Sequence, residues 1–339
     1  MTNFKFMLAP LEDMTSNALR TVCHKYGADL TFTELVRFES LAKNNKSTWD
    51  RIVFHDATPC FIQLIGHKEL FLKKFLSMFE PSKGFEGFNL NLGCPAPNFV
   101  NFGAGCAMVK RVSKTKKLVE VIKDRGYKAS IKLRLGLNRF EKDRKVFLNL
   151  IDGVDADFFV VHARHGQQSY NEPADFSVYA DCVKTGKVII ANGDISTREQ
   201  VESLRGVGVK GVMIGKPAIL DPSIFNRLKG LSCPDINDII KEYTSLTEKF
   251  DEPFRYRKNV LKRIGRKDFF GVGRMYVGKP IAPGKYSGHT RTHFYYRVSR
   301  IADLDRIIEH FDRYPLVGKK AKSYTIWKQM VDFKRKFKS

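Results

Sequence analysis

The turn Asn91–Pro95 holds a cysteine, Cys94, in a setting that is suited to chemistry. Pro95 restricts the backbone of the turn, and Gly93 allows that backbone to approach a ligand closely. A thiol placed there could act as a nucleophile or as a general acid. Most cysteines are instead small buried hydrophobic residues, and we expect that role for Cys106. Cys94 is therefore the candidate catalytic residue.

Gln63, Lys132 and His162 are the candidates for holding a ring-shaped cofactor. Lys132 lies within the apolar run 130–135, where an ammonium group is costly unless it meets an anionic partner. A flavin needs donors along its pyrimidine edge and a cation near N1 and O2, where the reduced ring carries negative charge. Gln63 and Lys132 are of the right types. A lone histidine after a strand is more often structural, so His162 is included because of its neighbours.

Two glycine-containing turns indicate a phosphate site. Asn192, Gly193 and Asp194 form one of them, and Gly215 and Lys216 form the other. Backbone N–H groups in such turns bind phosphate, and Lys216 adds a positive charge. Either turn alone could be no more than a tight connection. Together, after two consecutive predicted strands, they favour a cofactor that carries a phosphate.

Eight short apolar runs, each bounded by polar or glycine-rich turns, must position these residues. Apolar strands that alternate with helices predict an α/β fold with a parallel sheet covered on its outer face. Eight such units predict a (β/α)8 TIM barrel, and the absence of a GxGxxG turn after the first strand disfavours an open doubly wound sheet. The runs are 4–9, 30–33, 60–65, 87–92, 129–135, 158–161, 188–191 and 211–214, with helical periodicity at 70–79, 115–124, 144–151 and 198–204.

In a TIM barrel, the side chains just past the carboxyl ends of the strands face the active site. Polar residues are concentrated at these positions to a degree that packing explains poorly. We therefore expect the remaining residues of this rim to contact a cofactor or a substrate. They are Pro10, Leu11, Glu12, Asn91, Arg134 and Arg164.

The alternation of apolar runs and helical segments ends after the last predicted strand. We expect residues 1–235 to form the barrel and residues 236–268 to form one or two helices, interrupted near Pro253. Residues 269–339 combine glycine, aromatic and β-branched residues with a helical segment near 302–311, which predicts a smaller α+β appendage.

The formal net charge of +23 indicates a polyanionic partner, because such a surplus lies on the surface. Basic residues become denser after Lys241, which favours a local nucleic-acid-binding face over a general bias. This denser region includes Arg255, Arg257, Lys258, Lys262, Arg263, Arg266 and Lys267.

The six cysteines form no CxxC pair, so we expect reduced thiols and no metal site. No apolar run is long enough to span a membrane, and the first ten residues lack the layout of a signal peptide. These features predict a cytoplasmic protein.

Taken in order, the motifs resemble the dihydrouridine synthase family over about residues 5–230. The matching segments are 8–10, 27–29, the strand of Gln63, 91–95, 103–105, 132–134, 161–164, 191–195 and 211–215. The resemblance implies an FMN-dependent TIM-barrel enzyme that reduces the C5–C6 bond of uridine in tRNA, with NADPH or NADH as reductant.

The roles of the family's residues carry over by position. The resemblance implies that Cys94 donates a proton to C5 of uracil while hydride reaches C6. It implies that Gln63, Lys132 and His162 hold the flavin ring. The other expected cofactor contacts are Pro10, Leu11, Glu12, Asn192, Gly193, Asp194, Gly215 and Lys216, and the expected substrate contacts are Asn91, Arg134 and Arg164.

Two features depart from that family. Four residues near the expected cofactor or RNA path replace residues that are common in the family, so they bear on which uridine is the target. They are Leu11, Asp13, Asn98 and His165.

Residues from about 269 to 335 resemble half of a LAGLIDADG homing-endonuclease unit, in segments 270–273, 296–299, 303–308, 310–316 and 319–328. The acidic helix end that binds metal in such nucleases is absent from the sequence, so we expect a nucleic-acid-binding appendage without cleavage activity.

Two other functions remain open at this point. One is an FMN-dependent oxidoreductase acting on a small pyrimidine or an enoate, which would not need the basic C-terminal region. The other is a non-catalytic nucleic-acid-binding protein on a relic barrel, which would bind no flavin and would be colourless when purified.

Overall fold

The computed structural model describes residues 4–265, 274–277, 294–297, 304–313 and 319–336. Arg266, Lys267 and parts of the LAGLIDADG-like segments (270–273, 298–299, 303 and 314–316) lie outside these residues. The chain forms two compact units, Met1–Tyr256 and Arg257–Ser339, and each is described by itself. Among the described residues, no helix combines the length and the apolar character needed to cross a membrane.

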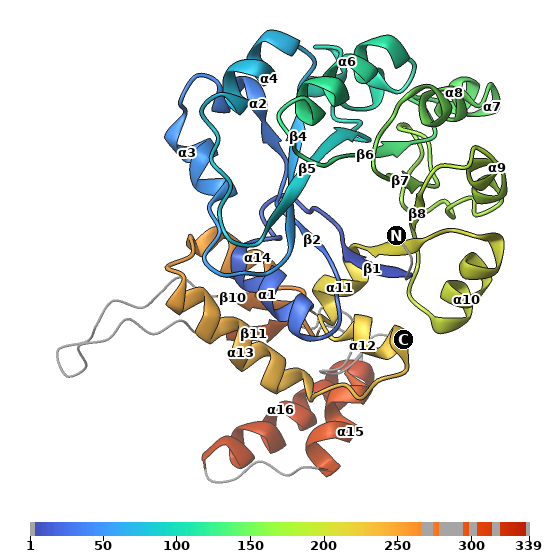
Figure 1. Ribbon diagram of the computed structural model, residues 1–339. Helices are drawn as coiled ribbons and strands as arrows, with labels where there is room; N and C mark the ends of the chain where they lie inside the picture. Colours follow the sequence, from blue (N-terminus) through green and yellow to red (C-terminus); the bar gives the residue numbers. More distant parts are fainter. Residues whose placement is uncertain (1–3, 266–273, 278–293, 298–303, 314–318, 337–339) are drawn as a thin grey trace. The chain divides into compact units, whose positions relative to one another are not determined.

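The first unit is a nearly closed parallel barrel of eight strands (Figure 1). Strand β1 pairs with β9, and the order continues through β8, β7, β6, β5 and β4 to β2. Between β2 and β1 a single bridge, Met7 to Leu30, spans the remaining gap. The strands are β1 (Lys5–Leu8), β2 (Thr31–Phe32), β4 (Cys60–Ile65), β5 (Phe85–Leu92), β6 (Ala129–Arg134), β7 (Phe159–His162), β8 (Ile189–Asn192) and β9 (Gly211–Ile214).

The predicted TIM barrel is therefore confirmed, and each of the eight apolar runs overlaps one of these strands. An additional short strand, β3 (Val36–Arg37), pairs with β4 and was not predicted. It leads into α2 (Phe38–Leu41), α3 (Lys46–Trp49) and the 3-10 turn η1 (Asp50–Ile52), which separate β3 from β4.

Helices cover the outside of the barrel because one face of each is apolar (Figure 1). The four segments with helical periodicity correspond to α4, α6, α8 and α10, so these predictions are confirmed. The helices of this layer are α1 (Asn17–Lys25), α4 (Glu69–Leu76), α6 (Val112–Lys123), α7 (Arg139–Asp143), α8 (Val146–Gly153), α9 (Val178–Lys184), α10 (Arg198–Val207), α11 (Lys216–Leu220) and α12 (Ile224–Lys229).

Two further helices follow, α13 (Ile236–Lys249) and α14 (Phe254–Leu261), with Pro253 between them as expected. In the second unit, β10 (Arg274–Val277) and β11 (Phe294–Arg297) form an antiparallel pair. Helix α15 (Asp305–Arg313) begins and ends slightly later than the predicted helix, and α16 (Lys319–Lys336) is the last element.

The barrel interior is built in layers because alternate residues of each strand point inward. Phe61, Phe158 and Ile190 belong to an apolar cluster inside the barrel, and the ring centroids of Phe61 and Phe158 lie 5.4 Å apart. Two or four residues further along the same strands come polar residues, such as Gln63 and His162. The apolar layer thus supports a polar layer at the carboxyl ends of the strands.

Tyr179 in α9 fixes the ends of β7 and β8, where the polar layer begins. Its side chain is fully buried. The hydroxyl oxygen accepts a hydrogen bond from the Asn192 backbone N–H at 2.9 Å and lies 2.8 Å from the Asn192 carbonyl oxygen and 3.1 Å from that of Val161. One hydroxyl group therefore lies within hydrogen-bond distance of backbone groups of two neighbouring strands.

We expect Tyr179→Phe to lower the free energy of unfolding by about 1–3 kcal/mol, because it leaves the buried Asn192 backbone N–H without its hydrogen-bond acceptor. Urea titration measures this loss. Tyr26→Phe is the matched control, since it also removes a hydroxyl that forms a hydrogen bond, to Glu242 at 2.6 Å, but at a partly exposed site. Equal losses in the two variants would contradict the assigned role of Tyr179.

Candidate active site

The register of the strands places the predicted rim residues side by side. Asn91 of β5 lies opposite Lys132 of β6, Arg134 lies opposite His162 of β7, and His162 lies opposite Asn192 of β8. Five consecutive strands, from β4 with Gln63 to β8, therefore contribute polar side chains to one end of the barrel. The structure thus brings these predicted residues together.

A chain of amide hydrogen bonds orients the part of the rim near Cys94. The Asn91 Nδ2 donates to Gln63 Oε1 at 2.8 Å, and Gln63 Nε2 donates to Asn89 Oδ1 at 2.8 Å. Asn89 Nδ2 then donates to Ser130 Oγ at 2.9 Å. Asn89 and Ser130 were not predicted, because they lie inside apolar runs and before the rim. Their role follows only from the pairing of β4, β5 and β6.

The other end of this chain holds the turn of Cys94. The Asn91 Oδ1 accepts hydrogen bonds from the backbone N–H groups of Gly93 at 3.0 Å and of Cys94 at 2.9 Å. Cys94 is partly exposed. Its partial burial raises the pKa of the thiol above the ordinary cysteine value, so the thiol is protonated at neutral pH. A positioned, protonated thiol is equipped to act as a proton donor.

Cys106 supports the same turn from the loop after β5. Its backbone N–H donates to the Cys94 carbonyl oxygen at 3.0 Å, and its thiol lies 3.1 Å from the Gly93 carbonyl oxygen. Burial raises the pKa of the Cys106 thiol to about 12. This side chain is fully buried, as expected for a core cysteine.

Positive charge gathers beside this turn. Lys132, Arg134 and Lys216 make no ion pair with any carboxylate in the part of the chain that the structure describes. Desolvation, and then the nearby Arg134 charge, lower the pKa of Lys132 to about 8. Desolvation and the same cations hold the pKa of His162 far below its ordinary value, so its imidazole is neutral. The site therefore has an excess of positive charge that suits an anionic ligand.

Tyr170, which the sequence did not reveal, lies at the centre of this charge. The Lys216 Nζ is 3.6 Å from the centroid of the Tyr170 ring, and the guanidinium carbons of Arg164 and Arg134 are 5.5 and 5.6 Å from it. Three cations thus contact one aromatic ring, whose side chain is 56% exposed. A tyrosine in a polar loop carries no sequence signal for such a role.

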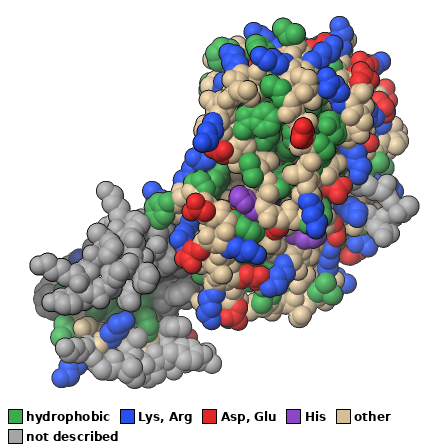
Figure 2. Space-filling view, turned by 60° about the vertical axis from the view of Figure 1, so that its left-hand side comes forward, with side chains coloured by type: hydrophobic (Ala, Val, Ile, Leu, Met, Phe, Trp, Pro, Cys, Tyr) green, Lys and Arg blue, Asp and Glu red, His purple; other side chains and the backbone are tan. Residues whose placement is uncertain are grey.

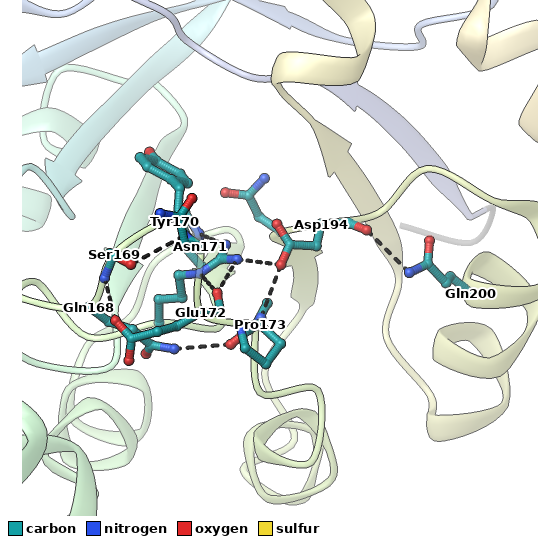
Figure 3. Close-up of polar contacts among 12 residues, drawn as sticks. Gln168, Ser169, Tyr170, Asn171, Glu172, Pro173, Asp194 and Gln200 are labelled. Atoms are coloured by element: carbon teal, nitrogen blue, oxygen red, sulfur yellow. Dashed lines mark hydrogen bonds and ion pairs between the residues drawn. The ribbon is translucent and has the colours of Figure 1, made fainter. Parts of the chain in front are cut away.

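A hydrogen-bonded frame holds the loop of Tyr170 (Figure 3). The buried Arg164 pairs with Asp194 and donates to the Glu172 carbonyl oxygen from Nε at 2.9 Å and from Nη2 at 2.6 Å. Asp194 also accepts from the Ala174 backbone N–H at 3.0 Å, and its own carbonyl oxygen accepts from Gln200 at 3.2 Å. Two predicted ligand contacts, Arg164 and Asp194, are therefore engaged with the loop and with each other.

The remaining predicted residues lie at the turns after β1, β8 and β9. The buried Asn192 side chain donates to the Met213 carbonyl oxygen at 2.8 Å, and Gly193 has a φ of 118°. A Cβ at Gly215 would meet only Ala9 at 3.6 Å and Leu11 at 4.0 Å, so the turn after β9 borders the turn Pro10–Glu12 after β1 and leaves space beside it. Among the described residues, no group of three or more His, Cys, Asp or Glu could hold a metal ion.

Gly105 permits the close approach of its loop to Cys94. Its φ is 57°, and a Cβ built there would lie 2.3 Å from the Cys94 carbonyl oxygen. We expect Gly105→Ala to cost clearly more stability than the ~1–2 kcal/mol of the left-handed conformation alone. Gly126→Ala is the control, because its φ is 79° and a Cβ would meet nothing within 4 Å. Urea unfolding compares the two, and equal losses would show that the Cys94 turn tolerates displacement.

The sequence is similar to known protein families and to individual proteins. Residues 255–331 match the LAGLIDADG endonuclease profile. A probable tRNA-dihydrouridine synthase of Helicobacter pylori is 31% identical over 228 residues, which cover 66% of this chain and 69% of that protein. The tRNA-dihydrouridine(47) synthase [NAD(P)(+)]-like protein of Xenopus tropicalis is 27% identical over 252 residues, which cover 71% of this chain but 39% of that protein.

Among solved structures, a variant of NCR from Zymomonas mobilis matches 71% of this chain and 93% of its own, with a TM-score of 0.43 and 15% identity. The match to the dihydrouridine synthase (Dus) profile spans residues 7–266. The profile thus covers all of the barrel except the first two residues of β1, and this chain belongs to the dihydrouridine synthase family.

Proposed function

We propose that this protein reduces the C5–C6 bond of a uridine in tRNA, with FMN as cofactor and NADPH or NADH as reductant. One observation carries the proposal: a protonated thiol, Cys94, is fixed by Asn91 beside a rim with excess positive charge, in a chain of the dihydrouridine synthase family. The net charge of +23 supports RNA over a small molecule as substrate.

The residues present fit a flavin. Lys132 has no carboxylate partner in the described structure and is poised to neutralise an anionic ring. The amide chain through Gln63 offers oriented polar groups at the same rim, and Lys216 and the turn at Gly193 would hold the phosphate. When bound, a reduced flavin supplies hydride to C6 of uracil.

The chain's own residues then control the proton and the substrate. The Cys94 Sγ–H bond breaks, and its proton goes to C5 of uracil while the electron pair of the bond stays on sulfur as a thiolate. Asn91 holds the turn that aims this thiol. The buried Arg134 of the next strand donates to the His165 carbonyl oxygen at 2.9 Å, so it helps to hold the Tyr170 loop, and the role proposed for it in contacting the substrate is exerted from there. We assign Arg164 to positioning, because its guanidinium holds the Tyr170 loop.

The target base must leave its stack to enter the barrel mouth, as in other enzymes that act on bases. The basic residues after Lys241, including Lys262 and Arg263, would contact the phosphate backbone of the tRNA and orient it without reading bases.

We expect Cys94→Ala to lose about 10²- to 10⁴-fold in dihydrouridine formation on tRNA, because it removes the general acid. The flavin absorbance of the purified variant should be unchanged. Cys106→Ala is the matched control, and it should keep its activity and lose only stability. Both variants are assayed in single-turnover reactions with reduced enzyme.

A normal rate in Cys94→Ala would remove Cys94 from the mechanism. Turnover of a free pyrimidine or an enoate in preference to tRNA would instead support the small-molecule function. A colourless preparation that binds no FMN would support the relic barrel.

The pKa of Lys132 predicts how cofactor affinity depends on pH. Its cationic form attracts the reduced, anionic flavin ring, and this form is lost as the pH rises through about 8. We therefore expect the affinity of the wild-type protein for reduced FMN to be full below pH 8 and to fall above it. Lys132→Arg should keep its affinity for reduced FMN constant between pH 7 and 9, and Lys132→Gln should be weak throughout. Anaerobic titration with reduced FMN measures this, and a wild-type affinity unchanged up to pH 9 would contradict it.

A further inference from the structure

A groove on the barrel, outside the site described above, combines aromatic and basic side chains. Its cavity has a volume of about 310 Å³ and is formed by β3 and α2, the turn after β4 and the loop after β5. We call it the aromatic–basic groove and define it by Arg37, Lys43, Lys68, Phe71, Phe99 and Phe102. Its volume is within the range of about 300–1,000 Å³ that is typical of pockets for small organic groups.

Each half of the groove pairs a ring with a cation. The guanidinium carbon of Arg37 is 4.6 Å from the centroid of the Phe99 ring. The ammonium nitrogens of Lys43 and Lys68 are 5.7 and 6.0 Å from the centroid of the Phe71 ring. Phe102 is 68% exposed at the edge of the same cavity. Phe71 and Phe99 are half-buried. Accessible rings interleaved with cations are the pattern of surfaces that bind single-stranded nucleic acid.

The positive charge of the groove is not neutralised within the barrel. A second cavity, which shares His67 and Lys68 with the first, adds Lys114 and Lys117. Within the described ranges, none of the basic residues of the two cavities forms an ion pair with a carboxylate.

The two acidic residues nearby are already engaged. Glu39 accepts from the His67 backbone N–H at 3.3 Å, and Glu69 pairs with Lys73 at 2.5 Å. Lys73 neutralises Glu69, whereas Glu39 keeps its charge beside three cations of the groove, Arg37, Lys43 and Lys68. A net positive charge therefore remains available to phosphates.

Figure 2 shows one face of the molecule, on which hydrophobic side chains lie among Lys and Arg side chains.

The groove adjoins the segment that carries the catalytic thiol. Phe99 lies on α5 (Pro97–Val100), five residues after Cys94, and Ala104 lines the same cavity. The next two residues, Gly105 and Cys106, contact the Cys94 carbonyl oxygen. A ligand in the groove therefore contacts the same loop that holds Cys94.

We propose that the aromatic–basic groove binds a single-stranded segment of the RNA substrate. One unpaired base stacks on the rings of Phe99 and Phe102, and the flanking phosphates contact Lys43, Lys68 and Lys114. This inference rests on the proposed function, since it assumes an RNA substrate. It differs from the contribution proposed for the C-terminal region, because all of these residues belong to the barrel.

The test is the equilibrium binding of a fluorescent 12-nucleotide unstructured RNA to the full-length protein at several salt concentrations. Phe102→Ala should weaken binding about 5- to 100-fold, as expected for the loss of one stacked base, and Phe102→Trp should restore it. Lys43→Gln with Lys68→Gln should reduce the log–log salt slope by about 1.4, at about 0.7 per charge. Circular dichroism verifies that each variant is folded.

The control variants carry substitutions of the same kind at positions outside the groove. Lys74→Gln with Lys83→Gln removes the same charge from exposed positions, and Leu70→Ala removes a side chain that is 75% exposed. These variants should bind RNA with the wild-type affinity, apart from a small uniform loss due to net charge. If the groove variants behave like these controls, the proposal is overturned.

Three further outcomes separate this proposal from the others. If poly-glutamate displaces the RNA and binds as well to Phe102→Ala as to wild type, the groove is a site for acidic peptides and the proposal fails. If the groove variants lose RNA binding while the wild-type enzyme forms no dihydrouridine in any tRNA, the groove proposal stands and the proposed function fails. If dihydrouridine forms normally and the groove variants bind RNA normally, only the groove proposal fails.

Discussion

The ammonium group of Lys132 sets the main physical constraint on this barrel. It lies at the rim of β6 beside Arg134, without a carboxylate partner in the described structure, and desolvation lowers its pKa to about 8. Uncompensated charge in such a place is costly. The charge of Arg134 adds to this cost, because it also disfavours the cationic form of Lys132. An anionic ligand at the rim would offset the cost, as the proposed flavin would.

The hydrogen-bonded chain from Ser130 to Asn91 orients the catalytic candidate. A thiol that donates a proton must point at one carbon atom, and a turn without side-chain hydrogen bonds would hold the thiol less firmly. Asn91 uses both ends of its side chain, donating to Gln63 and accepting from the backbone of Cys94. The expected flavin contact and the expected proton donor are therefore positioned by one side chain. A change at either end is transmitted to the other through two hydrogen bonds.

The sequence predicted the barrel well because eight apolar runs are a strong local signal, and strand ends then identify the rim. It did not predict β3, whose two residues carry too little pattern, or the layer of Asn89 and Ser130 below the rim. Tyr170 was missed for a different reason, since the position of its loop depends on the pairing of Arg164 with Asp194, which are 30 residues apart in the sequence. Asp194 itself was expected at a phosphate, whereas its carboxylate pairs with Arg164, a partner that only the fold reveals.

The position of the aromatic–basic groove gives a physical basis for the choice of target uridine. The segment from Cys94 to Ala104 separates the thiol from the groove, and Gly105 and Cys106 hold this segment against the Cys94 carbonyl. A base stacked on Phe99 or Phe102 would therefore lie at a fixed distance from the thiol. Only a uridine at a matching distance along the RNA strand could then reach the barrel mouth. Asn98, which replaces a residue that is common in the family, lines this groove. The barrel rim would thus determine the reaction. The distance between Cys94 and the aromatic–basic groove would determine which uridine is the target.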